Sequence, residues 1–206
     1  MKRLKITAYL KRPLLTNGDM YLDAIIYSYC AREQLGEDWY WNKLEMSQKL
    51  QNIKLPIQKV NGLYMCSRAK YKPKKEFVEY WRKRFQDGDQ FEKYCNLGKK
   101  SKLYVNMGVY KNYNMPINCI LTDKIEWIII GDKEEIEKIL KNIYTVGKKR
   151  SQGYGMVKEW KIEETKKRGE RHFPVHNKNI KEKKFFCSLK PPYFLLKREM
   201  CIIRKF

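Results

Sequence analysis

Apolar and polar residues alternate over residues 3–10, and this period of two predicts a first β-strand. From residue 20 to residue 35, apolar side chains instead recur every three or four positions, which is typical of a helix. Asp19 stands where a helix N-cap is expected, and Gly36 stands where such a helix usually ends. The start of the chain therefore predicts a strand followed by a helix.

Two further patterns lie in the first half of the chain. Residues 57–66 form two short apolar runs around Asn61-Gly62, a dipeptide preferred in tight hairpin turns. Between residues 74 and 85, aromatic side chains fall near one face of a helical wheel. We therefore expect a β-hairpin at the first position and an amphipathic helix at the second.

The pattern is clearest from residue 124 onward. Residues 124–132 predict a strand whose run Trp127–Ile130 is buried on both faces, and the aspartate at its end caps a helix over residues 133–144. After a glycine-rich loop, an alternating strand follows at residues 156–164. This order of elements is that of a βαββαβ ferredoxin-like sheet, an α+β fold, with a basic insertion at residues 67–120.

The last part of the chain, residues 166–206, carries Pro174, Pro191 and Pro192 between short apolar pieces. Proline has no N–H group and interrupts both helices and central strands. We therefore expect an irregular C-terminal arm that packs on one main domain, residues 1–165, rather than a separate second domain.

Composition and charge suggest a partner. The 206 residues include 45 Lys and Arg against 23 Asp and Glu, a net charge of +22, and 43% of them are hydrophobic, which supports a folded core. The excess is concentrated in two flanks, with +8 over residues 67–120 and +9 over residues 158–206, whereas residues 121–157 carry only +1. A charge of this size predicts nucleic acid as the partner, with an anionic membrane surface as the second candidate.

The cysteines are far apart in the sequence and form no CxxC pair: Cys30, Cys66, Cys95, Cys119, Cys187 and Cys201. Disulfide frameworks belong mainly to short secreted chains, and zinc sites favour closely paired cysteines. We therefore expect reduced, mostly buried thiols in a cytoplasmic protein, with no metal and no cofactor. Because no apolar run approaches the roughly 18 residues of a membrane span, we do not expect an integral membrane protein.

The segment with the most specific chemistry is the glycine-rich loop at residues 147–155. It follows a helix and leads into a strand, so it lacks the strand–loop–helix context of a nucleotide-binding P-loop. Glycines let the backbone approach a phosphate chain, three consecutive cations neutralise phosphates, and an aromatic ring offers a surface for base stacking. The alternative is a turn whose cations are merely solvated. The candidate RNA-binding residues of the loop are Gly147, Lys148, Lys149, Arg150, Ser151, Gln152, Gly153, Tyr154 and Gly155.

With this loop the sequence resembles a known family. A loop of this form, after the last helix of a ferredoxin-like unit, looks like the glycine-rich loop of the CRISPR-associated RAMP superfamily. Three more segments, YLDAIIYSY at residues 21–29, RHFPV at 171–175 and LKPPYFLLKREMC at 189–201, are similar to the small RAMP subunit of type IV effector complexes. That subunit is the counterpart of the one that caps the 5′ handle of the guide RNA in type I complexes.

The resemblance implies an RNA-recognition-like fold with a thumb-like insertion and a role in antiviral defence. It implies a non-catalytic subunit that binds the 5′ handle of the guide (cr)RNA and caps a filament of backbone RAMP subunits. The implied partners are this RNA, the backbone and other effector-complex proteins, and target DNA beside the protospacer, with no membrane.

The start of the expected insertion mixes cations with aromatic residues, as do surfaces that bind unpaired bases. We assign RNA contact to its cations, which are Arg68, Lys70, Lys72, Lys74 and Lys75. The aromatic residues fit a protein core or a subunit interface as well, and their role stays open: Phe77, Tyr80, Trp81 and Phe85.

Some RAMP relatives cleave precursor guide RNA without metal, using histidine, tyrosine and lysine. The only histidines here are His172 and His176, which flank Pro174 without the glutamate of an HExxH zinc motif. We expect them in a polar loop or a hydrogen-bonded pair, and we expect no enzyme. One alternative is a metal-independent endoribonuclease in which His172 and Tyr154 transfer protons. Another keeps the fold but makes the chain mainly an assembly subunit, with RNA held by its neighbours.

Overall fold

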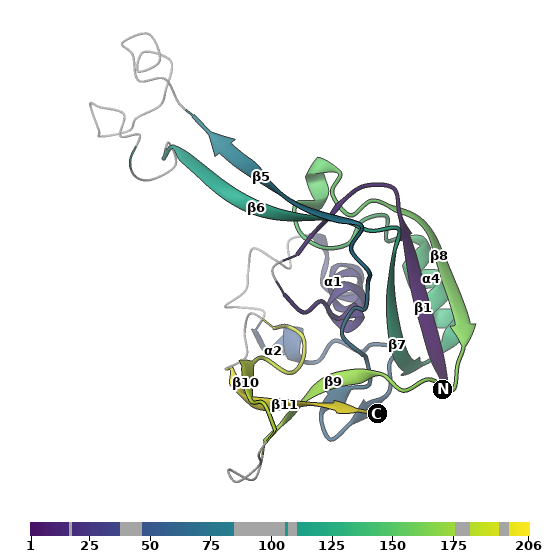
Figure 1. Ribbon diagram of the computed structural model, residues 1–206. Helices are drawn as coiled ribbons and strands as arrows, with labels where there is room; N and C mark the ends of the chain where they lie inside the picture. Colours follow the sequence, from purple (N-terminus) through teal and green to yellow (C-terminus); the bar gives the residue numbers. More distant parts are fainter. Residues whose placement is uncertain (17, 38–46, 85–105, 107–110, 176–181, 194–197) are drawn as a thin grey trace. The chain divides into compact units, whose positions relative to one another are not determined.

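The computed structural model describes residues 1–16, 18–37, 47–84, 106, 111–175, 182–193 and 198–206 (Figure 1). They belong to two units, one made of Met1–Lys75 with Ile120–Phe206 and the other of Glu76–Cys119. The fold class is α+β, as predicted, with more strands than helices. Each helix in the described part of the chain is too short or too polar to cross a membrane.

The main sheet of the first unit has the order β7-β1-β8, and its central strand β1 (Lys2–Leu10) is antiparallel to both neighbours. β7 spans Lys124–Gly131 and β8 spans Val157–Glu164. The strand predicted at residues 3–10 is confirmed: Leu4, Ile6 and Ala8 on one face are fully buried, and Thr7 on the other face is buried as well. The double burial predicted for β7 is wrong, since its buried residues alternate with half-buried or exposed ones.

An irregular extended segment, residues 65–70, runs along the other side of β7. The Ser67 N–H donates to the Ile128 carbonyl at 2.7 Å, and Lys70 and Glu126 exchange two backbone hydrogen bonds of 2.8 Å. The bridge between Lys70 and Glu126 is antiparallel. The spatial order of the extended segments is therefore 65–70, β7, β1, β8.

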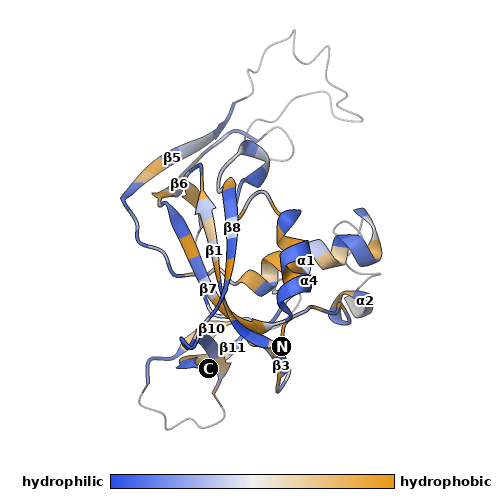
Figure 2. Ribbon diagram, turned by 90° about the vertical axis from the view of Figure 1, so that its right-hand side faces the viewer, coloured by the Kyte–Doolittle hydropathy of each residue, from blue (hydrophilic) through white to orange (hydrophobic). Residues whose placement is uncertain are grey.

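Two helices, α1 (Leu22–Leu35) and α4 (Lys133–Lys141), cover the same face of this sheet (Figure 2). Each buried side chain of Leu or Ile size contributes about 1.5–3 kcal/mol by leaving water, so a shared core holds the helices on the sheet. Helices and sheet contribute to that core Leu22, Ile26, Ile136, Leu140, Leu4, Ile6, Ile125, Trp127 and Ile129. A short helix, α2 (Ser47–Gln51), adds the buried Leu50.

The two main helices begin differently. Asp132 caps α4 as predicted, because its carboxylate accepts a hydrogen bond of 3.0 Å from the Glu135 N–H. α1 begins after Tyr21 without a side-chain cap, so the prediction for Asp19 is wrong. The Asp19 carboxylate instead lies 3.7 Å from the Arg68 guanidinium.

The hairpin predicted at residues 57–66 is confirmed as β3 (Lys59–Val60) and β4 (Leu63–Tyr64), which pair in antiparallel fashion. The two-residue turn between these strands has a positive φ at Asn61, as the type I′ hairpin turn that favours Asn-Gly requires. The signal for this hairpin lies entirely in neighbouring residues, so it could be predicted without knowing any contact to a distant part of the chain.

The described part of the second unit consists mainly of β5 (Lys75–Lys83) and β6 (Tyr113–Leu121), which are hydrogen-bonded neighbours. The helix predicted over residues 74–85 is therefore wrong. Along β5 half-buried and exposed side chains alternate, with Phe77 and Trp81 on the half-buried side. Aromatic residues favour strands, and this preference outweighed the helical spacing.

The C-terminal part of the chain is a sheet, which corrects the prediction of an irregular arm over residues 166–206. β9 (Glu170–Pro174) and β10 (Phe185–Cys187) both pair in antiparallel fashion with β11 (Glu199–Lys205), which lies between them. This sheet packs over a second core made of Leu63, Met65, Leu189 and Cys201. Pro174 is tolerated because it ends an edge strand, where its missing N–H is not needed.

Two cysteines of this sheet are bonded to each other. Cys187 and Cys201 form a disulfide, so the expectation of reduced thiols is wrong for this pair. Cys30, Cys66 and Cys119 are free and buried, as expected.

Candidate nucleic-acid interface

The glycine-rich loop connects α4 to β8, as the sequence predicted, and its own backbone closes it. The Val146 N–H donates to the Gly155 carbonyl at 2.9 Å. Gly155 has a φ of +62°, and a Cβ there would lie 1.9 Å from the Val146 carbonyl oxygen. Only glycine permits this closure. Between these ends, Arg150–Gln152 form one turn of 3-10 helix.

The loop is anchored on the short strand β2 (Leu14–Leu15), whose two side chains are buried. The Lys148 N–H donates to the Leu15 carbonyl, and the Gly155 N–H donates to the Pro13 carbonyl, both at 2.8 Å. At Gly147 a Cβ would lie 2.6 Å from the Leu15 oxygen, so the two backbones are as close as glycine allows. The position of the loop is therefore fixed by backbone contacts.

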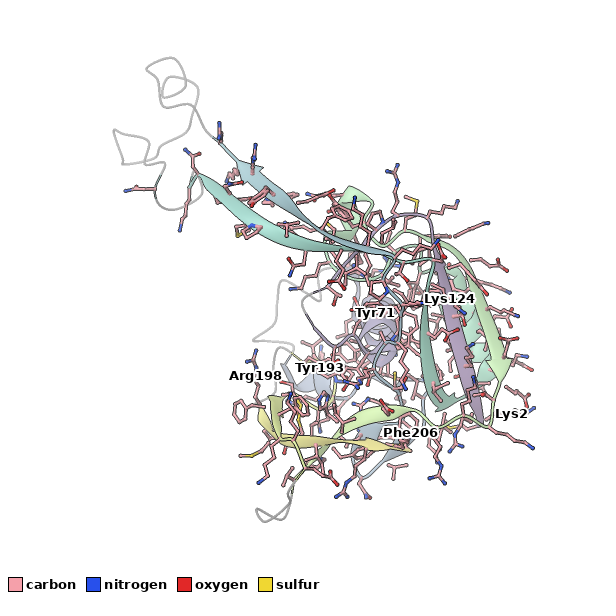
Figure 3. All side chains as sticks on the ribbon, viewed as in Figure 1. Lys2, Tyr71, Lys124, Tyr193, Arg198 and Phe206 are labelled. Atoms are coloured by element: carbon pink, nitrogen blue, oxygen red, sulfur yellow. A yellow bond between two sulfur atoms is a disulfide. The ribbon has the colours of Figure 1, made fainter. Side chains whose placement is uncertain are left out.

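A first cavity, of about 670 Å³, opens between this loop, the start of α1 and the C-terminal sheet. Ile25 and Ser28 of α1 line it, together with Phe186 next to the disulfide. Its charged and aromatic lining residues are Lys148, Arg150, Arg198, Asp19, His172, Tyr21 and Tyr193, of which Tyr193 and Arg198 are labelled in Figure 3. Among the described lining residues, cations outnumber carboxylates.

A second cavity, of about 620 Å³, shares Ile25, Ser28 and Arg150 with the first, so the two adjoin across these residues. Its described lining residues include no acidic side chain, and the cations among them are Arg32, Lys149 and Arg150. Two tyrosines also line it: Tyr29, which the guanidinium of Arg32 approaches to 5.5 Å, and the exposed Tyr144. The pair of cavities thus combines positive charge with accessible aromatic rings.

The predicted cations differ in whether a carboxylate of the protein pairs with them. Among the described residues, Lys148 and Arg150 have no ion pair, and both side chains are exposed. By contrast, Arg68 and Lys70 each lie 3.4 Å from the carboxylate of Glu170. Burial tends to raise the pKa of Glu170, but these two cations outweigh burial and hold it below its ordinary value. Their charge is therefore already partly neutralised by the protein.

The other cations that were predicted to contact RNA also differ in their partners. Lys74 pairs with Asp123 at 2.7 Å. Lys72 and Lys75 are exposed. Three of the five predicted cations are therefore paired with a carboxylate, whereas Lys72 and Lys75 have no ion pair within the described residues.

The aromatic residues of β5 contact neighbours within the second unit. The indole N–H of Trp81 donates to the hydroxyl of Tyr113, and the guanidinium of Arg82 lies 5.8 Å from the ring centre of Tyr80. Tyr80 is exposed and Phe77 half-buried. Phe85 lies outside the described residues, as does Cys95 of the predicted thiols.

His172 lies on β9 rather than in a polar loop, which corrects that expectation, and it is only 5% exposed. Its Nδ1 is hydrogen-bonded to the Tyr21 hydroxyl at 2.5 Å and lies 3.7 Å from Asp19. Burial lowers the pKa of His172, which Asp19 only partly opposes. Its described contacts do not include Tyr154, which lies in the loop, and His176 lies outside the described residues.

A buried ion pair ties α1 to the C-terminal sheet beside the first cavity. Asp23 is fully buried and Arg171 is 1% exposed, and their charged groups lie 2.9 Å apart. The Tyr193 hydroxyl donates to the other Asp23 oxygen at 2.8 Å, and Arg171 donates to the Cys66 carbonyl at 3.0 Å. Burial disfavours the charged guanidinium, but Asp23 outweighs this effect and raises the pKa of Arg171. This network positions the cavity lining.

A family model described as "CRISPR type IV associated protein Csf3" matches residues 2–204 of this chain. The chain belongs to the Csf3 family. Curated proteins give no significant match. Among solved structures, a chain of a type III-B Cmr-β complex bound to cognate target RNA is similar, with 11% identity and a TM-score of 0.41 over 79% of this chain. This chain spans 61% of that one. A chain of the Csm3–Csm4 subcomplex of the type III-A interference complex has 11% identity and a TM-score of 0.40, covering 100% of this chain and 91% of its own.

In this Csf3-family chain, several residues of the cavities were not predicted from the sequence. α1 contributes Ser28, Tyr29 and Arg32. The sequence did not indicate which face of this helix lies toward the loop. Arg198 comes from the segment before β11. Ser28 and Arg32 are four residues apart, which places them on one helix face, and this spacing was the only available signal.

Proposed function

We propose that this Csf3-family protein is a non-catalytic subunit of a type IV CRISPR ribonucleoprotein and binds the 5′ handle of its guide RNA through the glycine-rich loop. The observation that carries the proposal is the pair of adjoining cavities, which Arg150 lines on both sides. Lys148 and Arg150 have no acidic partner in the described part of the chain, so their charge is available to phosphates.

The chemistry of the second cavity favours a single strand over a duplex. Unpaired bases stack on aromatic rings and arginine planes, whereas a duplex hides its base faces. Tyr29, Tyr144 and Arg32 supply such surfaces beside the cations of the loop. A strand whose phosphates follow the loop can therefore place its bases toward α1 and Tyr144.

We infer a ferredoxin-like core for the first unit. The support is the order 65–70, β7, β1, β8 with α1 and α4 on one face, which matches a βαββαβ unit in both sequence and space. In our proposal, Glu76–Cys119 is the thumb-like insertion and contacts a backbone RAMP subunit, so that the protein caps the filament. Target DNA beside the protospacer is the further partner.

The surroundings of His172 support binding rather than cleavage. A general base must reach the proton that it removes, and the two nitrogens of this ring are buried. One of them is already engaged by Tyr21. We therefore propose that the chain does not process precursor guide RNA.

Site-specific crosslinking tests the proposed interface. The purified protein is bound to repeat-derived RNA that carries 4-thiouridine at one handle position at a time, irradiated and analysed by peptide mass spectrometry. We expect crosslinks in residues 147–155 and at Tyr29 or Tyr144, and none with the same RNA annealed into a duplex. Crosslinks confined to other segments would refute the assignment of the loop.

A parallel assay addresses the two alternatives. Labelled repeat RNA is incubated with the protein in EDTA, and we expect it to stay intact. Discrete cleavage that the substitution His172→Ala abolishes would replace our proposal with an endoribonuclease. If the triple substitution Lys148/Lys149/Arg150→Ala leaves RNA binding of the assembled complex unchanged, the chain is mainly an assembly subunit.

A further inference from the structure

The C-terminal sheet brings together three residues that are far apart in the sequence. In the register of this sheet, Cys201 lies opposite Phe185 and Pro174, while His172 lies opposite Ile203. Side chains at directly opposite positions, and at positions two residues along, point to the same face of a sheet. Because Cys187 is two residues from Phe185, the side chains of His172, Cys187 and Cys201 share one face.

Their potential ligand atoms form a tight cluster. A ring nitrogen of His172 and the sulfur atoms of Cys187 and Cys201 all lie within 4.8 Å of one another. A tetrahedral zinc ion with bonds of about 2.0–2.3 Å to nitrogen and sulfur holds its ligand atoms at separations below this limit. Once the disulfide is reduced, its two sulfur atoms need only move apart to this spacing for the cluster to surround an ion.

His172 contributes an independent sign of a missing ligand. Its Nε2 atom is buried and has no hydrogen-bond partner among the described residues. A buried polar atom without a partner costs about 1–3 kcal/mol, and native proteins rarely leave one unpaired. A metal bond at Nε2 would satisfy it, since Nδ1 is already engaged by Tyr21.

The surroundings of His172 match those of a metal-bound histidine. Such a histidine donates its other ring N–H to an oxygen atom, which fixes the ring and its tautomer. Here the Tyr21 hydroxyl lies 2.5 Å from Nδ1, with the Asp19 carboxylate at 3.7 Å. His172 and Cys187 also line the first cavity, so the cluster lies at the edge of this cavity.

We propose that His172, Cys187 and Cys201 bind a zinc ion when the two cysteines are reduced. The disulfide and the metal are then alternative states of one cluster. Two thiol groups of a cellular reductant reduce the disulfide by transferring two electrons and two protons, and they are oxidised to a disulfide in turn. Each cysteine then loses its proton when its thiolate binds Zn²⁺. This site escapes spacing rules, because its ligands come from three strands rather than from a CxxC pair.

Metal content and cobalt spectra test the proposal on the full-length protein. The protein is reduced with a phosphine, freed of metal with a chelator, incubated with Zn²⁺ and desalted, and its zinc is measured by mass spectrometry. We expect one zinc per chain, a higher melting temperature with zinc, and thiolate-to-metal charge transfer when Co²⁺ replaces it. Reduced, folded wild-type protein that retains no zinc would overturn the proposal.

Alkylation provides a readout inside one molecule. Zinc should protect Cys187 and Cys201 from a thiol reagent, whereas Cys30, which is also buried but lies on α1, should react at the same rate with and without zinc. Equal effects of zinc on all three thiols would contradict the assignment.

Four substitutions separate zinc binding from folding. Cys187→Ser and His172→Gln should abolish stoichiometric zinc, while Cys30→Ser should keep it. Tyr21→Phe keeps the ring but removes the hydroxyl behind His172, and we expect zinc affinity to fall about 10- to 100-fold. If Cys187→Ser does not fold, Tyr21→Phe and wild-type alkylation still decide the outcome. Unchanged zinc affinity in both His172→Gln and Tyr21→Phe would refute the site.

Discussion

The three consecutive cations of the glycine-rich loop offer the sharpest test of the proposed interface. Lys148, Lys149 and Arg150 each line at least one of the two cavities, and the loop backbone is held by β2 and by its own closure. Replacing all three with alanine should therefore remove positive charge without moving the backbone. We expect a variant that folds like the wild type and binds RNA with a weaker salt dependence.

The size of the effect follows from counterion release. Each phosphate of a single strand that a cation neutralises contributes about −0.7 to the slope of log K against log salt. Three lost contacts should make the slope shallower by about 2. When salt is raised fourfold, the affinity of the wild type should then fall about 16- to 20-fold more than that of the variant.

Fluorescence anisotropy with labelled repeat-derived RNA, at several KCl concentrations, measures this slope. The matched control is the triple substitution Lys2/Lys141/Lys161→Ala, which removes the same charge. Each of these lysines is exposed and paired with a carboxylate, so its charge is already balanced locally. We expect the control to change the slope by less than about 0.5. A lysine that is already paired with a carboxylate at the surface adds little net positive charge to the attraction of RNA.

Two results would refute this reasoning. If both triple variants made the slope shallower by the same amount, RNA would respond to the total charge and not to the loop. If the loop variant kept the wild-type slope while remaining folded, these three cations would not contact phosphates.

Other substitutions test the fold around this site. Gly155→Ala places a Cβ against the backbone at a residue with positive φ, and it should lower the free energy of unfolding by at least about 2 kcal/mol. Gly153→Ala also has positive φ but open space around the new Cβ, and it should lower the free energy of unfolding by about 1 kcal/mol. Urea unfolding measures both values. Asp23→Ala leaves a buried guanidinium without its carboxylate and should cost about 3–5 kcal/mol in the same assay, a value that a loss below 1 kcal/mol would contradict. Arg68→Ala should leave the RNA salt slope unchanged within about 0.3, because Glu170 already neutralises this cation. A slope shallower by 0.7 would instead restore Arg68 to the interface.

Elements with complete local signals were predictable from the sequence. The helix after Asp132 combines a capping side chain, acids in the first turn and apolar residues on one side, and it begins at the predicted residue. It ends at Lys141, three residues before the predicted end, where Asn142 provides the C-cap. The hairpin at Asn61 was equally local.

β5 shows where such signals fail. Phe77, Tyr80 and Trp81 fit a helical face at spacings of three and four, but Phe77 and Trp81 also fit one face of a strand. The pattern alone could not decide between these two periods, and pairing with β6 did. The C-terminal strands were missed for a related reason, because their partners lie many residues away in the chain.

The candidate site was likewise predictable only where its residues are close together in the sequence. The loop was predictable because glycines and cations occur together within nine residues. Its other half was not, since α1 and Arg198 reach the cavities only through tertiary packing. The buried pair of Asp23 and Arg171, which positions this packing, joins residues 148 positions apart.

Net charge and local compensation have different consequences for RNA binding. The total of +22 attracts any polyanion from a distance and raises the rate of encounter. What holds a strand in one place is cationic charge that the protein itself does not neutralise. Arg68 and Lys70 fail this criterion because they share Glu170, although they lie in a strongly basic segment. Among the residues that the structure describes, Lys148 and Arg150 meet this criterion, although they lie in the nearly neutral segment. We therefore expect the guide RNA to be held by cations that have no acidic partner in the described part of the chain, and a basic segment contributes only through such cations.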